Sequence, residues 1–151
     1  MIVHLGVICI AVALAASNSF TRSQELDLVE GRPAAFAGHT FTLRGFETTS
    51  DERATRVRAL VSIDGGRAYA PAITKYLRVG MTVGTPSVRT GLARDVYLTL
   101  EPPVRQDSGR ARIKVFVKPM ILWIWIGTGV TVLGTLAALV PTRRQIGRAH
   151  V

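Results

Sequence analysis

The segment from Met120 to Val140 reads MILWIWIGTGVTVLGTLAALV and contains no charged residue. An α-helix rises about 1.5 Å per residue, so roughly 20 apolar residues cross a hydrocarbon core of about 30 Å. A chain of 151 residues is too small to surround an uncharged helix of that length on all sides. The sequence therefore predicts a transmembrane helix, assigned to residues 119–141.

Aromatic and basic side chains flank this segment. Lys118 precedes it, Trp123 and Trp125 lie near its start, and Arg143 and Arg144 follow its end. Tryptophan rings favour the membrane–water interface, and arginines just beyond a span mark the cytoplasmic side. We therefore expect all of these side chains to lie at a membrane interface.

The two ends of the chain require separate interpretations. The first residues, MIVHLGVICIAVALAAS, form a second apolar run with a small-residue exit at Ala13-Leu14-Ala15, as in a signal peptide, but no Lys or Arg precedes the run. A helix from Met1 to Ala16 spans only about 24 Å, so we assign 1–18 to a transmembrane helix truncated at its start. Residues 142–151 are expected to be a cytoplasmic tail, of which 146–151 match the translation of a common sequencing adapter and are interpreted as an artefact.

Between the apolar runs, polar and apolar residues alternate with period two. In residues 54–63, Val57, Val61 and Ile63 fall on one face, and the same alternation recurs in 95–101 and 112–118. Such alternation is typical of half-buried strands. The sequence predicts an all-β domain over 19–118, a sandwich or partly open barrel of about six to eight strands. The expected fold is a mixed membrane protein, in which two transmembrane helices flank a small extracytoplasmic β domain.

The net charge of +9 raises the question of an anionic partner. Nucleic acid is not expected, because the middle of the chain lacks a dense basic run with interleaved aromatic residues and faces away from the cytoplasm. Membrane lipids with anionic head groups, or an anionic cofactor, are better candidates. A solvated basic surface is an equally open interpretation.

His4 is the one residue that suggests chemistry. The sequence contains no nucleophile–histidine–carboxylate set, no Cys/His metal spacing and no phosphate-binding glycine loop. An imidazole inside an apolar membrane run costs free energy, which makes it a functional candidate, and imidazole is a common axial ligand of haem iron. A histidine that reaches from a helix end toward the interface is the alternative. A second axial ligand would have to come from elsewhere.

Small residues line one side of the second apolar run. Gly134 and Ala138 form a small-xxx-small pair, with Gly127 and Thr131 on a similar face. Such positions permit close approach of helices, so we expect packing against other membrane helices.

Several motifs occur in an order that resembles a known family. They are Val3-His4-Leu5-Gly6, then Gly91-Leu92-Ala93-Arg94-Asp95-Val96-Tyr97-Leu98, and finally Lys118-Pro119 followed by Trp123-Ile124-Trp125-Ile126-Gly127. Together they resemble the C-terminal portion of the CcmF family, the haem lyase subunit of System I cytochrome c maturation. Val3 stands where that family commonly has Ala, and the residues after Tyr76 lack its usual Pro and Thr-Glu pattern.

The resemblance implies a multi-pass protein of the bacterial inner membrane with its β domain in the periplasm. It implies haem delivery and covalent attachment to apocytochrome c, with a haem chaperone and other cytochrome c maturation subunits as partners. By the motif match, His4 is an axial ligand of a b-type haem. The family's tryptophan-rich haem-binding loop is absent, so this chain alone is not expected to be catalytic. The alternative is a binding or structural protein with a signal peptide, cleaved near Ala16, and a single-span anchor.

Overall fold

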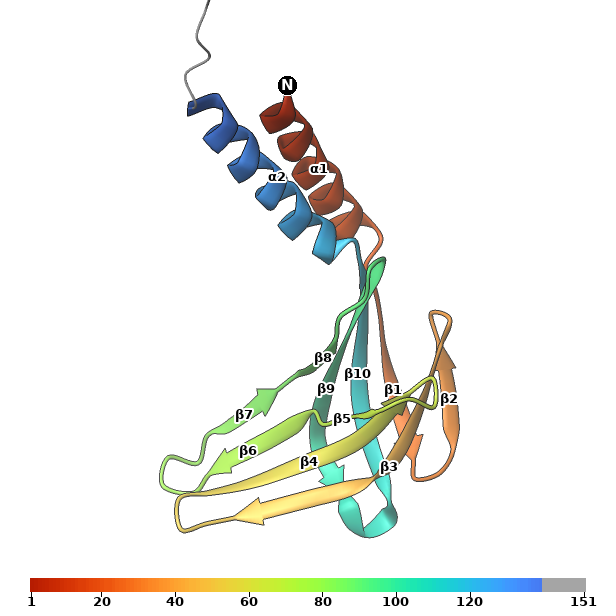
Figure 1. Cartoon of the computed structure of the whole chain (residues 1–151). Coiled ribbons are helices and arrows are strands. Elements are labelled where there is room, and N and C mark those ends of the chain that lie inside the picture. Colours follow the sequence, from red (N-terminus) through yellow and green to blue (C-terminus); the bar gives the residue numbers. More distant parts are fainter. Residues whose placement is uncertain (140–151) are drawn as a thin grey trace, which may run out of the picture.

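The computed structural model describes residues 1–139 and consists of two helices and ten strands (Figure 1). The helices are α1 (Ile2–Ser19) and α2 (Ile121–Leu139). The strands are β1 (Arg22–Val29), β2 (Pro33–Phe36), β3 (His39–Ser50), β4 (Ala54–Ile63), β5 (Ala68–Tyr69), β6 (Ala72–Tyr76), β7 (Thr82–Thr85), β8 (Ser87–Arg89), β9 (Arg94–Arg105) and β10 (Arg110–Pro119), with a 3-10 turn at Gln106–Ser108.

The strands form two antiparallel sheets. One has the order β1-β10-β9-β8, and the other has the order β2-β3-β4-β6-β7, with β5 paired to β4. The all-β domain between two apolar helices is therefore confirmed. The strand count exceeds the predicted range because β2, β5, β7 and β8 contain only two to four residues each, too few for an alternating pattern to be recognised.

The apolar core lies between the two sheets. Alternation along each strand places one face inward. Of the positions predicted to share a face in residues 54–63, Val61 and Ile63 are buried and Val57 is half-buried, and in the other two alternating segments Leu98 and Val115 are buried. The other members of the core cluster share this inward position: Leu26, Leu28, Phe41, Leu43, Ala59, Ile73, Val96, Leu100, Ala111, Ile113 and Val117.

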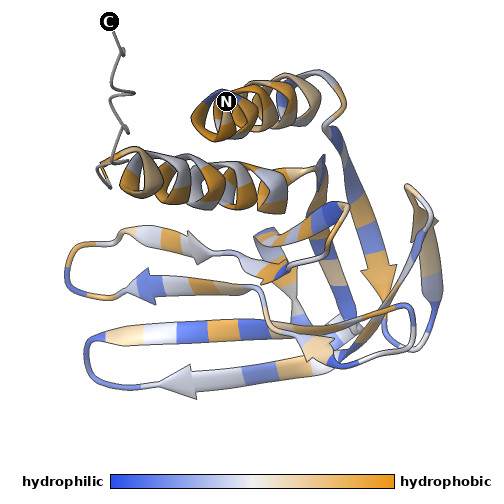
Figure 2. Cartoon of the chain, turned by 45° about the horizontal axis from the view of Figure 1, so that its top comes forward, coloured by the Kyte–Doolittle hydropathy of each residue, from blue (hydrophilic) through white to orange (hydrophobic). Residues whose placement is uncertain are grey.

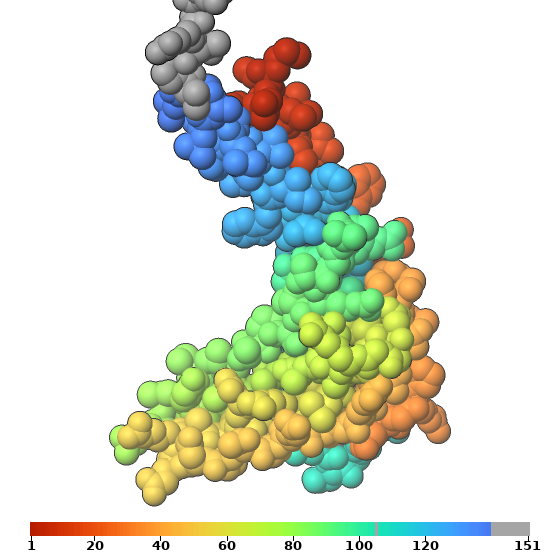
Figure 3. All heavy atoms as spheres, viewed as in Figure 1, coloured from red at the N-terminus to blue at the C-terminus, as the bar shows by residue number. Residues whose placement is uncertain are grey.

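The helix pair forms a stalk that continues from one end of the β domain (Figure 3). The amide of Met120 donates to the carbonyl oxygen of Ala93 (2.9 Å), and the indole N–H of Trp123 donates to that of Leu92 (3.1 Å). These bonds tie the turn between β8 and β9 to the start of α2. They also explain why α2 begins at Ile121 and not at the predicted residue 119: β10 continues through Pro119, and Met120 bonds to the β domain.

Both helices are long and apolar enough to cross a membrane, and apolar residues run along them (Figure 2). They pack closely where Gly6 faces Gly127 and Thr131, and again where Gly134 faces Val3. The small-residue face of α2 therefore contacts α1, which supplies a partner within the chain.

Two features predicted near the end of α2 have different outcomes. Ala138, predicted to pair with Gly134, is exposed, whereas Gly134 is buried. Arg143 and Arg144 lie outside the described residues, as do 146–151.

Candidate functional site

His4 lies on the surface of the helix pair. The buried side of α1 carries Gly6, Ala13 and Ser17, whereas His4 is exposed. Its neighbours on that outer side are apolar, and with them it lines a shallow hollow whose walls include Leu5 and Ile8. The imidazole therefore faces whatever surrounds the helix pair and does not face α2.

The imidazole of His4 has no hydrogen-bond partner in the part of the chain that the structure describes. In residues 1–139 no group of three or more His, Cys, Asp or Glu side chains is placed to hold a metal ion. His4 thus offers a single nitrogen donor on an apolar surface. A haem fits this arrangement chemically, because the apolar neighbours suit a porphyrin face and one imidazole suits one axial position.

Three of the predicted interface residues, Lys118, Trp123 and Trp125, lie near the junction of α2 with the β domain. Trp123 is 42% exposed and bonded to the Leu92 carbonyl, while Trp125 is 71% exposed. The ammonium group of Lys118 lies 5.4 Å from the centre of the Tyr97 ring, a cation–π distance. These side chains occupy the level at which an interface would lie if α2 spans a membrane.

Asp64, in the turn after β4, connects the two sheets. Its carboxylate accepts hydrogen bonds from the Thr40 amide (2.9 Å), from Nδ1 of His39 (2.8 Å) and from the Arg89 guanidinium (2.6 Å). Arg89 belongs to β8 of the first sheet, whereas Thr40 and Asp64 belong to β3 and to the turn after β4 of the second. These hydrogen bonds hold the pKa of Asp64 well below its ordinary value. The bond from the Thr40 amide has the largest effect, followed by those from Arg89 and His39.

Asp64→Asn should destabilise the β domain by about 1 kcal/mol at neutral pH, because a charge-assisted bond to Arg89 is lost at a partly exposed site. A carboxylate whose folded pKa is depressed stabilises the fold above its unfolded pKa, and the benefit is lost as pH falls through the folded value. The gap in unfolding free energy between the two proteins should therefore be constant near neutrality and shrink below about pH 4. Denaturant titrations across pH measure this gap. A gap that persists unchanged at pH 2 would show that the charge is not responsible.

Together, the fold and the site define a small β domain carried on a pair of apolar helices, one of which presents an outward-facing histidine. No family model matches the chain. The cytochrome c-type biogenesis protein CcmF of Pseudomonas fluorescens is 28% identical over 96% of the chain, and that of Haemophilus influenzae is 26% identical over 95%. The cytochrome c-type biogenesis protein ccl1 of Rhodobacter capsulatus is 30% identical over 71% of the chain.

A solved structure has the same fold. The cytochrome c haem lyase CcmF matches 93% of this chain with a TM-score of 0.74 and 21% sequence identity. The chain spans only 22% of the length of the first two relatives and 24% of that solved chain. The chain is thus related to the CcmF family of cytochrome c biogenesis proteins.

Proposed function

We propose that the chain acts in cytochrome c biogenesis as the helix-pair and β-domain portion of a CcmF-like assembly that delivers haem and attaches it to apocytochrome c. The similarity to CcmF proteins along nearly the whole chain supports this proposal. The partners would be a haem chaperone, apocytochrome c and other maturation subunits.

In this proposal α1 and α2 span the bacterial inner membrane, and the β domain lies in the periplasm. The length and composition of both helices support the placement. The close glycine contacts of α1 with α2 favour a permanent span for α1 over a signal peptide, because a cleaved segment would have no use for such a fitted interface.

The proposal for the site rests on the exposed imidazole of His4. A polar ring on the apolar surface of a membrane helix is costly unless another group meets it, so His4 needs a partner beyond this chain. We assign it as one axial ligand to the iron of haem b, with a second histidine supplied by another helix. When bound, the haem would supply a one-electron redox centre. Leu5 and Ile8, which line the same hollow, would pack against the porphyrin and exclude water.

His4→Ala should weaken haem binding by about tenfold or more, because even the loss of a group that only supports a metal ligand costs 10–100-fold. The measurement is a titration of the chain in detergent micelles with ferrous haem, followed by the shift of the Soret band. His39→Ala is the matched control, because it removes the imidazole that is bonded to Asp64 in the β domain.

Replacing His4 with glycine, which leaves space for free imidazole, allows a second test of the same site. Imidazole added to the His4→Gly protein should restore the Soret shift if the original residue is a ligand. Equal binding by wild type and His4→Ala, or an equal loss with His39→Ala, would remove His4 from the haem site.

A further inference from the structure

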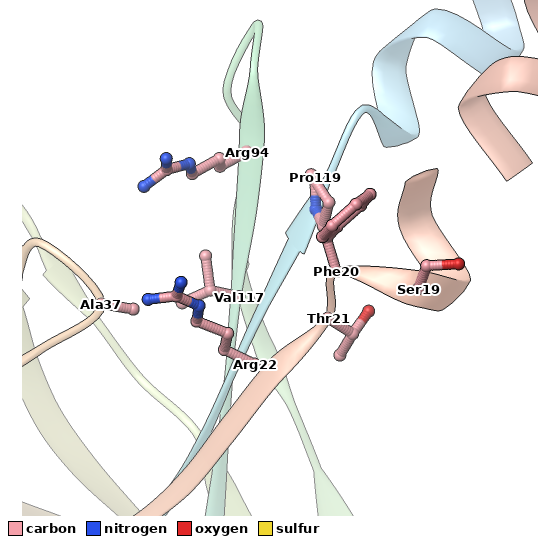
Figure 4. Close-up of a pocket in the computed structure, with 8 residues that line it drawn as sticks. All are labelled: Ser19, Phe20, Thr21, Arg22, Ala37, Arg94, Val117 and Pro119. Carbon is pink, nitrogen blue, oxygen red and sulfur yellow. The ribbon is translucent and has the colours of Figure 1, made fainter. Parts of the chain in front are cut away.

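A pocket lies where the helix pair joins the β domain. Its lining includes Phe20 just after α1, Pro119 just before α2, Arg22 of β1 and Arg94 of β9. Figure 4 shows both guanidinium groups extending to the same side of the sheet, with that of Arg22 beside Ala37 in the turn between β2 and β3. Phe20 and Pro119 lie beside each other below the helices.

The strand register explains why the two arginines share this pocket. Arg22 pairs with Val117, and Arg94 pairs with Pro119, on either side of β10. Residues opposite each other across antiparallel strands share a face, as do residues two apart in one strand. Val117 belongs to the buried core, so both arginines stand on the inward face of the sheet, at the end of the core nearest the helices.

Neither arginine is neutralised within the described residues. Other arginines of the domain pair with carboxylates, as Arg89 does with Asp64 and Arg112 with Asp27. In contrast, Arg22 and Arg94 have no such partner in residues 1–139, and no acidic side chain lines the pocket. Guanidinium groups match the geometry of phosphate oxygens and bind them with paired hydrogen bonds. The pocket is therefore suited to an anion.

We propose that this pocket binds the phosphate of an anionic phospholipid, with the acyl chains lying along the helix pair. The inference rests on the proposed membrane placement of α1 and α2, but not on His4. The pocket lies where α1 ends and α2 begins, which is the level at which head groups would lie. Phe20, 71% exposed at that level, offers an apolar surface to the first part of an acyl chain. A lipid phosphate at this depth would sit between the guanidinium groups and the hydrocarbon.

The test compares two double variants with the same loss of charge. Arg22→Gln with Arg94→Gln removes the pocket charges. Arg53→Gln with Arg78→Gln is the control, because these exposed arginines lie in the turns after β3 and β6, away from the helices (Figure 1). Each protein is inserted into phosphatidylcholine vesicles that contain a small fraction of phosphatidylglycerol, extracted in mild detergent, and its bound lipids are quantified.

Wild type and the control should retain phosphatidylglycerol in excess over phosphatidylcholine, and the pocket variant should retain about 30-fold less, from the loss of two arginines near a membrane surface. An equal decrease in both variants would overturn the proposal in favour of a general charge effect. Competition by inorganic phosphate at the same concentration as the lipid would show a site for free anions and overturn the lipid assignment. Haemin binding that depends on Arg22 and Arg94, without phosphatidylglycerol enrichment, would assign the pocket to haem carboxylates instead.

Insertion is checked by flotation of the vesicles after alkaline washing. If the protein inserts but shows no lipid selectivity, the pocket is not a phospholipid site, and the proposed function still holds. A chain that does not insert overturns the membrane placement and this inference with it.

Discussion

Leu43→Ala should lower the free energy of unfolding of the β domain by about 2–5 kcal/mol, the usual cost of removing a buried leucine side chain. Leu43 is 0% exposed and contacts the core between the two sheets. Its carbonyl oxygen accepts a hydrogen bond from the Gly31 amide (2.9 Å), so the residue lies where the chain passes from β1 to the second sheet. The surrounding backbone is thereby fixed, and the cavity left by alanine would collapse little.

Leu77→Ala is the matched control for this substitution. Leu77 follows β6 and is 52% exposed, so its truncation should change the unfolding free energy by less than about 0.5 kcal/mol. Denaturant unfolding of the chain in detergent micelles, followed by the circular dichroism of the strands, measures both variants. Comparable losses for Leu43 and Leu77 would contradict the position of the core.

The core was predictable because alternation depends only on neighbouring residues. Val61, Leu98 and Val115 lie inward as their pattern indicated, since a strand with one buried face must repeat every second residue. The edge strand β7 (Thr82–Thr85) is exposed along its whole length, so no burial pattern marks it. Its pairing with β6 is seen in the structure, but no alternating pattern in its own sequence predicts it.

The polar contacts were not predictable for a related reason. Asp64 meets Arg89 and His39 because three separate segments converge, and no spacing in the sequence encodes that convergence. The inward position of Arg22 and Arg94 could have been inferred from alternation, since Leu26 and Val96 continue the same rows. What alternation could not show is that both side chains remain exposed there, so that two charges stand on an inward face.

The helix contact could be predicted only in part. Small residues in α2 indicated close helix packing, but they do not identify the helix that packs against them. In the structure that helix is α1, and the contact depends on Gly6 as much as on Gly127.

Gly6→Ala should separate the two helices and cost about 1–3 kcal/mol, the usual price of overpacking. A Cβ atom at Gly6 would lie 2.7 Å from the carbonyl oxygen of Gly127 and 2.7 Å from the amide nitrogen of Thr131. Both are backbone atoms, so no side-chain rotation relieves the clash and one helix has to move. Unfolding in mixed micelles with increasing sodium dodecyl sulfate, followed by energy transfer between labels on the two helices, measures the loss of pairing.

Gly129→Ala provides a control with the same change of side chain. No atom lies within 4 Å of a Cβ placed at Gly129, so this substitution should leave helix pairing unchanged or slightly strengthen α2 through the better helix propensity of alanine. Equal effects of the two substitutions would show that the glycine contact does not hold the helices together. Because His4 is exposed on α1, away from its buried Gly6 face, Gly6→Ala should also leave the Soret shift with haem intact. Loss of that shift would mean that the position of α1 against α2, and not His4 alone, determines haem binding.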